Sequence, residues 1–180
     1  MVSRYVVVVA FLVACGGSSD KAGPGGDVTR FVGMYATTSH TYVQVFGEDV
    51  TCADPAPPVT NAAPFFRLAV DSFFMDPDVL SISDCMDAAG TSCEEGFVTL
   101  RAGGPGLEDE SANSQTGGGL CQLHYTHAQA TLTGATVQIE SLEKYDAPAL
   151  SSNDCTLQRA EALASSPDCR SVERWTGTRP

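Results

Sequence analysis

The sequence predicts a mainly β domain, either a small antiparallel β-barrel or a curved sheet, with one C-terminal α-helix packed on it. Short segments rich in β-branched and aromatic residues recur along the chain, and each is bounded by turn residues. A two-residue turn around Gly134 joins two alternating segments. A helical period occurs once, after residue 152. Several strands followed by one helix favour a sheet that the helix covers.

Four segments before residue 102 have the composition of strands. They cover residues 31–46, 65–70, 79–83 and 97–101. Residues 54–64 contain several prolines and are expected to form a loop. Residues 102–119 are rich in glycine and carry three consecutive acids, so we expect a long polar loop there.

The clearest local signal is a hairpin. Thr133-Gly134-Ala135-Thr136 has the pattern of a two-residue turn with glycine first. Such a turn fixes the register of the strands on either side. The expected pairs, which share a mostly apolar face, are Leu132 with Val137, Ala130 with Ile139, and Ala128 with Ser141.

A helix is predicted between this hairpin and the C-terminus. Ser152 or Asn153 is expected to cap it, and it should run to about Ser165 with Pro167 as a stop signal. The tail that follows has one large aromatic residue, Trp175, which we expect to cover an open end of the sheet. The apolar stripe of the helix consists of Leu157, Ala160, Leu163 and Ala164.

The N-terminus has the pattern of an export signal. Arg4 is the one charged residue among the first fourteen, and an apolar run from Tyr5 to Val13 follows it. This order is typical of a secretory signal. The run is shorter than the roughly 20 residues that a membrane-spanning helix needs.

The apolar run ends in Leu12-Val13-Ala14-Cys15, which closely resembles the lipobox of bacterial lipoproteins. The resemblance implies that the Cys15 thiol is linked to diacylglycerol and that residues 1–14 are removed. Gly16 follows the cysteine where an aspartate would favour retention in the inner membrane, so the resemblance implies a lipid anchor in the outer membrane. The alternative is an ordinary cleaved signal with a chance cysteine.

These features divide the chain into three parts. Residues 1–14 are expected to be the signal peptide. Residues 15–28, with the lipidated cysteine and many glycines and serines, should form a flexible tether. Residues 29–180 are long enough for one domain with its own core.

The charge of the chain excludes one class of partner. The formal net charge is −12, and no basic patch with interleaved aromatic residues occurs. A body this acidic is repelled by phosphate backbones, so nucleic acid is not an expected partner.

Seven cysteines indicate an oxidising compartment. Assigning Cys15 to lipid leaves an even set, which in an exported protein predicts three disulfides. Cys85 and Cys93 flank a short turn-rich segment and are expected to pair. Cys155 and Cys169 flank the predicted helix and should pair with each other or with the barrel. Zinc is the competing interpretation, but no Cys-x-x-Cys occurs among Cys52, Cys85, Cys93, Cys121, Cys155 and Cys169.

A second resemblance concerns the first predicted strand. Phe31-Val32-Gly33-Met34-Tyr35 resembles the F-x-G-x-W motif in the first strand of lipocalins, with tyrosine here in place of tryptophan. The resemblance implies a lipocalin-like or calycin-like barrel in which the glycine bends the strand and the aromatic residue plugs the closed end. A helix after the last strands is also similar to lipocalins.

The histidines and acids do not form a recognisable reactive site. His124 and His127 are three apart on a predicted strand and therefore lie on opposite faces, so no metal site is predicted. His124 falls on the apolar face opposite Tyr145, where it is either a polar group in a ligand cavity or a hydrogen-bonded residue near the sheet end. The acids at 76 and 78, 94 and 95, and 108–110 lack calcium-loop spacing and are expected in exposed turns.

The sequence therefore favours a binding protein without catalysis, since no hydrolase, phosphate-loop, dinucleotide or zinc-protease motif occurs and no cofactor is implied. The first hypothesis is a lipid-anchored module that binds a small apolar ligand or lipid. The alternative is a structural or interaction lipoprotein that contacts another envelope protein. The residues expected to line a ligand cavity are Tyr35, Phe66, Phe73, Phe74, His124 and Ile139.

The lipobox gives the first testable prediction. The mature protein should begin at Cys15 and carry fatty acid, because lipidation precedes removal of the signal in lipoproteins. Mass spectrometry of the intact chain extracted from the envelope measures both properties. A mature chain that retains its first fourteen residues and carries no fatty acid would contradict the assignment of Cys15.

Overall fold

The computed structural model describes residues 18–20, 27–44, 50–53, 62–70, 76–103, 106–117, 120–146 and 155–180. The predicted signal peptide and Cys15 lie outside these residues, as does most of the proline-rich segment 54–64. Among the described residues, no helix is long and apolar enough to cross a membrane.

The predicted antiparallel β-barrel is confirmed. Among the described residues, eight strands pair in chain order, and the last returns to the first and closes the barrel. Three short strands lie outside this ring: β1 (Ser18–Asp20) pairs with β7, and β3 (Val50–Thr51) pairs with β10 (Asp168–Cys169). The barrel strands are β2 (Gly33–Gln44), β4 (Phe65–Val70), β5 (Val79–Cys85), β6 (Cys93–Gly103), β7 (Gly106–Gly117), β8 (Leu120–Thr133), β9 (Thr136–Asp146) and β11 (Ser171–Thr178).

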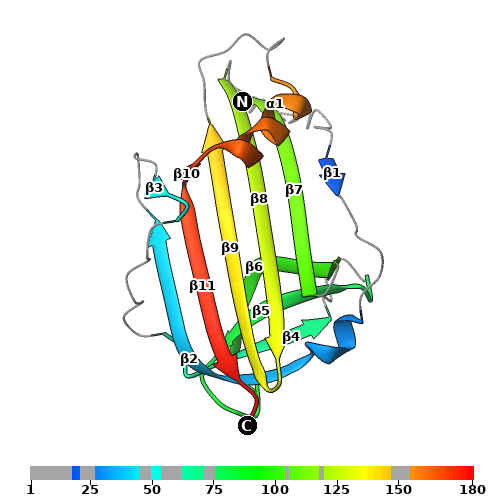
Figure 1. Cartoon of the computed structure of the whole chain (residues 1–180), viewed down its shortest axis with the longest axis vertical. Helices are drawn as coiled ribbons and strands as arrows, with labels where there is room; N and C mark the ends of the chain where they lie inside the picture. Colours follow the sequence, from blue (N-terminus) through cyan, green and yellow to red (C-terminus); the bar gives the residue numbers. More distant parts are fainter. Residues whose placement is uncertain are drawn as a thin grey trace, which may run out of the picture.

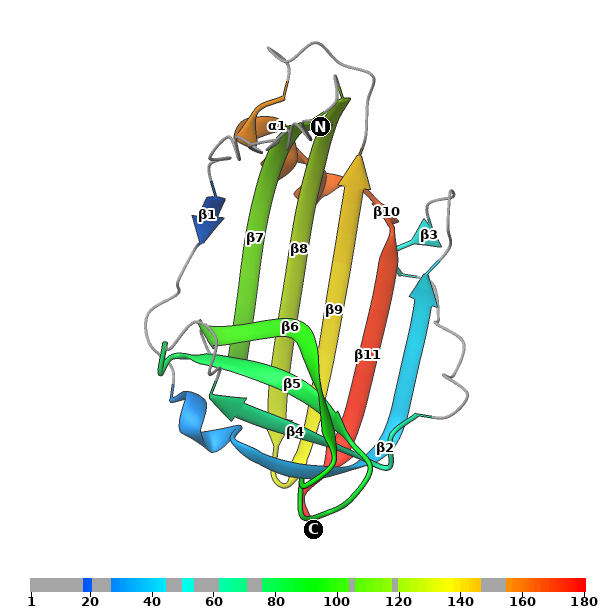
Figure 2. The same cartoon turned by 180° about the vertical axis from the view of Figure 1, so that it is seen from behind.

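The barrel is uneven in height. The strands β7, β8, β9, β11 and the second half of β2 run side by side along its full length, whereas β4, β5 and β6 cross behind their lower half (Figure 1). Above β6 the long strands continue as a curved sheet, and Figure 2 shows this uncovered part from the side of β4–β6. We call the face of the long strands that turns toward β4–β6 the inner face.

The long strands bury opposite faces at their two ends. In the lower half of β8, Ala128 and Ala130 point to the inner face and join the main core. In its upper half, Leu123 and Tyr125 point outward and pack with Ala160 of the helix α1 (Leu157–Ala162) in a second cluster. The pairing of β8 with β9 has no register shift, so alternate residues keep to one face throughout.

The helix covers the outer face of the upper ends of β7 and β8 (Figure 1). Its N-cap is Thr156, whose side chain accepts from the backbone N–H of Arg159, and its last turn continues as a 3-10 turn over Leu163–Ser165. The predicted start near Ser152 or Asn153 lies outside the described residues, and the prediction of a longer helix is wrong because the capping oxygen is that of Thr156. The helix also precedes β11, so it does not follow the last strand as expected.

The closed end of the barrel is packed with aromatic side chains. Tyr35 and Phe66 are fully buried and stack with ring centroids 5.3 Å apart. The Tyr35 hydroxyl donates to the Phe31 carbonyl oxygen at 2.8 Å, close to the short 3-10 helix η1 (Val28–Arg30). Gly177 lies against the Phe66 ring and the Cβ of Tyr35, and a Cβ at this position would overlap the Phe66 ring.

A bulge in β2 turns the side chains of His40 and Tyr42 inward. In the β2–β11 ladder Gly177 pairs with Thr37 and Thr176 with Ser39, which leaves Thr38 as an extra residue. An extra residue exchanges the two faces of a strand. Tyr35 therefore faces the core below the bulge, and His40 faces inward above it, where it stacks on Trp175.

The hairpin is confirmed pair by pair. Ala128 lies opposite Ser141, Ala130 opposite Ile139, and Leu132 opposite Val137. Gly134 has φ of +61°, a value that favours glycine at the first turn position. Local turn chemistry and apolar alternation are therefore sufficient to set this register.

Two other segments differ from the sequence prediction. Residues 102–119 were expected to be a loop, but β6 continues to Gly103 and β7 covers 106–117. The polar side chains of β7 do not prevent a strand because β8 supplies a backbone ladder along one edge, while β6 and β1 pair with parts of the other edge. The C-terminal tail with Trp175 is strand β11, which closes the barrel between β9 and β2 instead of covering its end.

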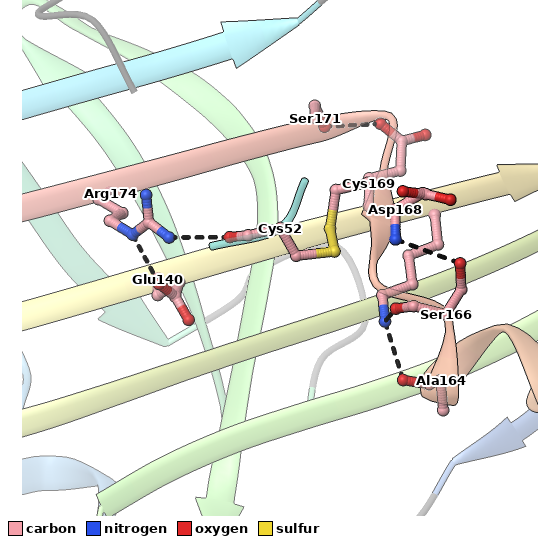
Figure 3. The surroundings of a disulfide bond; sticks show 10 residues. Cys52, Glu140, Ala164, Ser166, Asp168, Cys169, Ser171 and Arg174 are labelled. Carbon is pink, nitrogen blue, oxygen red and sulfur yellow. Dashed lines mark hydrogen bonds and ion pairs between the residues drawn. A yellow bond between two sulfur atoms is a disulfide. The ribbon is translucent and has the colours of Figure 1, made fainter. Parts of the chain in front are cut away.

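Three disulfides connect these elements. Cys85–Cys93 joins β5 to β6 as predicted. The other two are Cys121–Cys155, between β8 and the start of the helix, and Cys52–Cys169. Cys155 and Cys169 therefore bond to separate partners outside the helical segment. Figure 3 shows Cys52–Cys169 beside Arg174, whose guanidinium donates to the Cys52 carbonyl oxygen and to Glu140.

A buried lysine holds the end of the helical segment to the sheet. Lys144 of β9 is 6% exposed, and its Nζ donates to the carbonyl oxygens of Ala164 at 2.8 Å and Ser166 at 2.7 Å. Carbonyls at a helix C-terminus have no partner within the helix and carry partial negative charge. The ammonium therefore caps the helical segment and ties it to the outer face of β9.

Replacing Lys144 by methionine should lower the free energy of unfolding by about 1.5–3 kcal/mol, the range for hydrogen bonds to a charged group. The two carbonyls would lose their donor while the methionine retains most of the apolar stem. Urea denaturation measures the change. Arg159→Met, an exposed cation on the same helix, is the matched control and should stay within about 0.5 kcal/mol of the wild type; equal losses in both variants would contradict the capping role.

Candidate ligand site in the mouth of the barrel

The structure separates the residues predicted to line a ligand cavity. Tyr35, Phe66 and Ile139 lie together in the main core, each at most 3% exposed. His124 lies on the inner face above that core, where its ring makes an edge contact with Tyr145. Phe73 and Phe74 lie outside the described residues. The four described members of the predicted set therefore do not surround one cavity.

A cavity of about 300 Å³ opens where the inner face of the long strands rises above β6. Residues from six barrel strands line it, and most of them are polar. Val98 and Ala128 form its apolar part, at the upper boundary of the main core. The described residues that line it are Tyr42, Val98, Thr99, Asp109, Thr126, Ala128, Ser141, Glu143, Ser171 and Glu173.

A second cavity of about 250 Å³ continues from the first between the β5–β6 hairpin and β11. The two cavities share Val98 and Glu173 in their linings. The second adds Ile82, Asp84, Glu94, Gly96 and Trp175. We refer to the two together as the mouth cavity.

Five carboxylates line the mouth cavity, and each comes from a different strand. They are Asp84 of β5, Glu94 of β6, Asp109 of β7, Glu143 of β9 and Glu173 of β11. The prediction that residues 94 and 108–110 lie in exposed acidic turns is wrong because they belong to β6 and β7. Alternation along a strand turns Asp109 toward the cavity while Glu108 binds His127 on the outer face.

Three of these carboxylates are held in place by neighbours. Asp109 accepts from the Thr99 hydroxyl and forms an ion pair with Arg101 at 3.2 Å. Glu173 lies 2.7 Å from Nε2 of His40. Glu143 accepts from the Ser171 hydroxyl at 3.0 Å. These contacts fix the positions of the carboxylates and leave oxygen lone pairs for a further donor.

Aromatic side chains form one wall of the cavity. Trp175 is 5% exposed and stacks on His40 with ring centroids 4.9 Å apart. Its indole Nε1–H has no hydrogen-bond partner among the described residues. Tyr42 lies nearby, and burial together with the charges of Glu173 and Glu143 raises the pKa of its phenol. Its hydroxyl therefore remains protonated and donates to Gln44.

His124 lies at the upper edge of this site. Its Nδ1 is 3.7 Å from Glu143. Burial lowers the pKa of the imidazole below the ordinary 6.5, although Glu143 acts in the opposite direction. The ring is therefore harder to protonate in the folded chain than in the unfolded one.

The arrangement is suited to binding a small molecule by polar contacts. Within the described ranges, no group of three or more histidine, cysteine or acidic side chains is placed to hold a metal ion. Sequence patterns do not reveal most of these residues, because their side chains are polar and a polar face on a strand usually indicates the solvent face. The spacing of Glu173 and Trp175, two apart on one strand, was the available signal.

Comparisons with protein-family models, with curated proteins and with solved structures found no match to this chain. The function proposed below rests on the mouth cavity and on the sequence of the N-terminus.

The position of His124 gives a prediction about pH. Because its folded-state pKa is lowered, the imidazole contributes to stability above its unfolded pKa, and this contribution is lost as the pH falls below about 6.5. Between about pH 7.5 and about pH 5.5, the wild type should lose more unfolding free energy than His124→Gln, as measured by urea denaturation. His127→Gln, on the outer face, is the control. Equal pH dependence in the two variants would contradict this assignment.

Proposed function

We propose that this chain is a cell-envelope lipoprotein, anchored in the outer membrane through lipid on Cys15, whose barrel binds a small ligand without catalysis. The mouth cavity is the proposed binding site. Signal peptide, lipid attachment and ligand binding are parts of one proposal, and each has its own test.

The single observation that carries the binding role is the difference between the two ends of the barrel. An eight-stranded barrel is either filled by its own side chains or wide enough for one small ligand. Here the lower end is filled by Tyr35, Phe66 and their neighbours, while the upper end keeps a cavity of about 300 Å³. The likeness of residues 31–35 to the lipocalin first strand agrees with this division, because the aromatic residue of that motif plugs the closed end.

The lining changes the expected kind of ligand. The sequence predicts an apolar molecule held among aromatic side chains, but Tyr35 and Phe66 are packed in the core. The mouth cavity instead presents carboxylates, hydroxyls and the side chain of Trp175 over a small apolar floor. These groups favour a polar ligand with a short carbon body.

The described N-terminal segment is consistent with anchoring close to the mouth. Ser18–Asp20 pair with β7, and Ser18 lies opposite Asn113 in the upper half of that strand. Three peptide units separate Cys15 from Ser18, a span of at most about 11 Å. Lipid on Cys15 would therefore hold the upper end of the barrel near the membrane surface, so we propose that the mouth faces the bilayer.

The proposal predicts a bound small molecule that a larger side chain displaces. In Ser141→Phe the ring would fill the cavity from β9, while Gln138→Phe places the same ring on the outer face of the same strand as a control. Native mass spectrometry of the full-length proteins extracted from envelopes should show a small-molecule adduct on the wild type and Gln138→Phe but not on Ser141→Phe. An adduct-free wild type would favour the alternative, a structural or interaction lipoprotein.

A further inference from the structure

We propose that the ligand of the mouth cavity is an organic ammonium compound that also carries a hydroxyl or carbonyl oxygen, such as an amino alcohol or an amino sugar. The ammonium would lie among the carboxylates of Glu173, Glu94 and Asp84, and the oxygen would accept from the indole N–H of Trp175. This inference rests on the proposed binding function and adds the chemical class of the ligand.

The charge of the cavity selects a cation. Five carboxylates line it, and the described residues of its walls include no lysine or arginine. Arg101 pairs with Asp109 from outside the lining, and His40 contacts Glu173. Asp84 and Glu94 have no ion-pair or hydrogen-bond partner among the described residues, and they lie directly opposite each other on β5 and β6. Like charges in such a pair repel, and a cation between them removes the repulsion.

The unpartnered indole supplies independent evidence of a ligand. The side chain of Trp175 lies on the inner face, as its stacking on His40 and its place in the main core show. It contributes to the wall of the second cavity, close to Glu173. A buried N–H without an acceptor costs free energy, and buried polar groups in native proteins are nearly always satisfied. The Nε1 atom is closed off by its neighbours, so an oxygen atom of a bound molecule would satisfy it once the wall around it moves.

The same residues disfavour a bare metal ion. The described acidic and histidine side chains form no group of three that could coordinate one. The joined cavities of about 300 Å³ and about 250 Å³ are large for an ion, and Ile82, Val98 and Trp175 offer apolar contact to a carbon skeleton. An ammonium on a small ring or chain uses both the charge and the apolar surface.

Three matched probes separate charge from shape. They are trans-4-aminocyclohexanol, 1,4-cyclohexanediol and trans-4-hydroxycyclohexanecarboxylate, which share a ring and a hydroxyl and differ in charge. Trp175 is the one tryptophan of the chain, so its fluorescence and its indole N–H resonance report on this cavity alone. The full mature protein is titrated with each probe, and both signals are followed.

The expected result is saturable binding of the ammonium probe with a downfield shift of the indole N–H resonance, and no saturable change with the diol or the carboxylate. Glu173→Gln should weaken binding of the ammonium probe about tenfold, because one charge-assisted contact is lost. Glu94→Gln, which removes an exposed carboxylate from the opposite wall, should weaken it as well. Glu108→Gln removes the same charge from the outer face and should bind like the wild type.

Two outcomes would overturn the inference. One is that the diol or the carboxylate binds as tightly as the ammonium probe. The cavity would then be a ligand site without a preference for a cation. The other is no response of Trp175 to any probe. Native mass spectrometry tests the binding function separately. If none of the probes behaves as expected but Ser141→Phe removes a small-molecule adduct, the cavity binds a ligand of another class.

Discussion

The structure depends on one constraint: a continuous set of long strands must bury both of its faces, each over half of its length. Below, β4–β6 cover the inner face, and the even residues Ala128 and Ala130 of β8 enter the core. Above, α1 covers the outer face, and the odd residues Leu123 and Tyr125 are buried instead. Since neither covering layer reaches the upper inner face, that surface is left to polar side chains. The mouth cavity is the consequence of this arrangement.

The distance of a residue of β11 from the mouth then determines which kind of side chain it carries. The inward residues of β11 run from Glu173 at the mouth through Trp175 at the wall to Gly177 in the packed end. Each suits its surroundings, because a carboxylate needs solvent or a polar neighbour, an indole tolerates burial on one side, and only glycine fits against the Phe66 ring. The bulge at Thr38 places His40 beside Trp175 in the same layer.

Sequence patterns predict those parts of the fold whose signal is local. The register of β8 and β9 follows from Gly134 and from apolar residues two apart, and the structure reproduces it. The strand β7 gives no such signal, because its alternating polar residues face solvent or the mouth cavity, and only its neighbours on both sides make it a strand. The cavity was beyond prediction for a related reason: its existence depends on β4–β6 crossing only the lower half of the long strands, which no single segment reveals.

The positions of the disulfides follow from the same geometry. Cys121–Cys155 and Cys52–Cys169 join elements of the upper half, where the sheet has a covering layer on one side and apolar burial is smallest. Cys85–Cys93 has another consequence. Its two residues pair across β5 and β6 directly beside Asp84 and Glu94. Repulsion between those carboxylates favours a slip or a fraying of the hairpin end, and the covalent bond prevents both. The disulfide thereby keeps two negative charges facing each other at the mouth, an arrangement that noncovalent pairing alone would tend to relax.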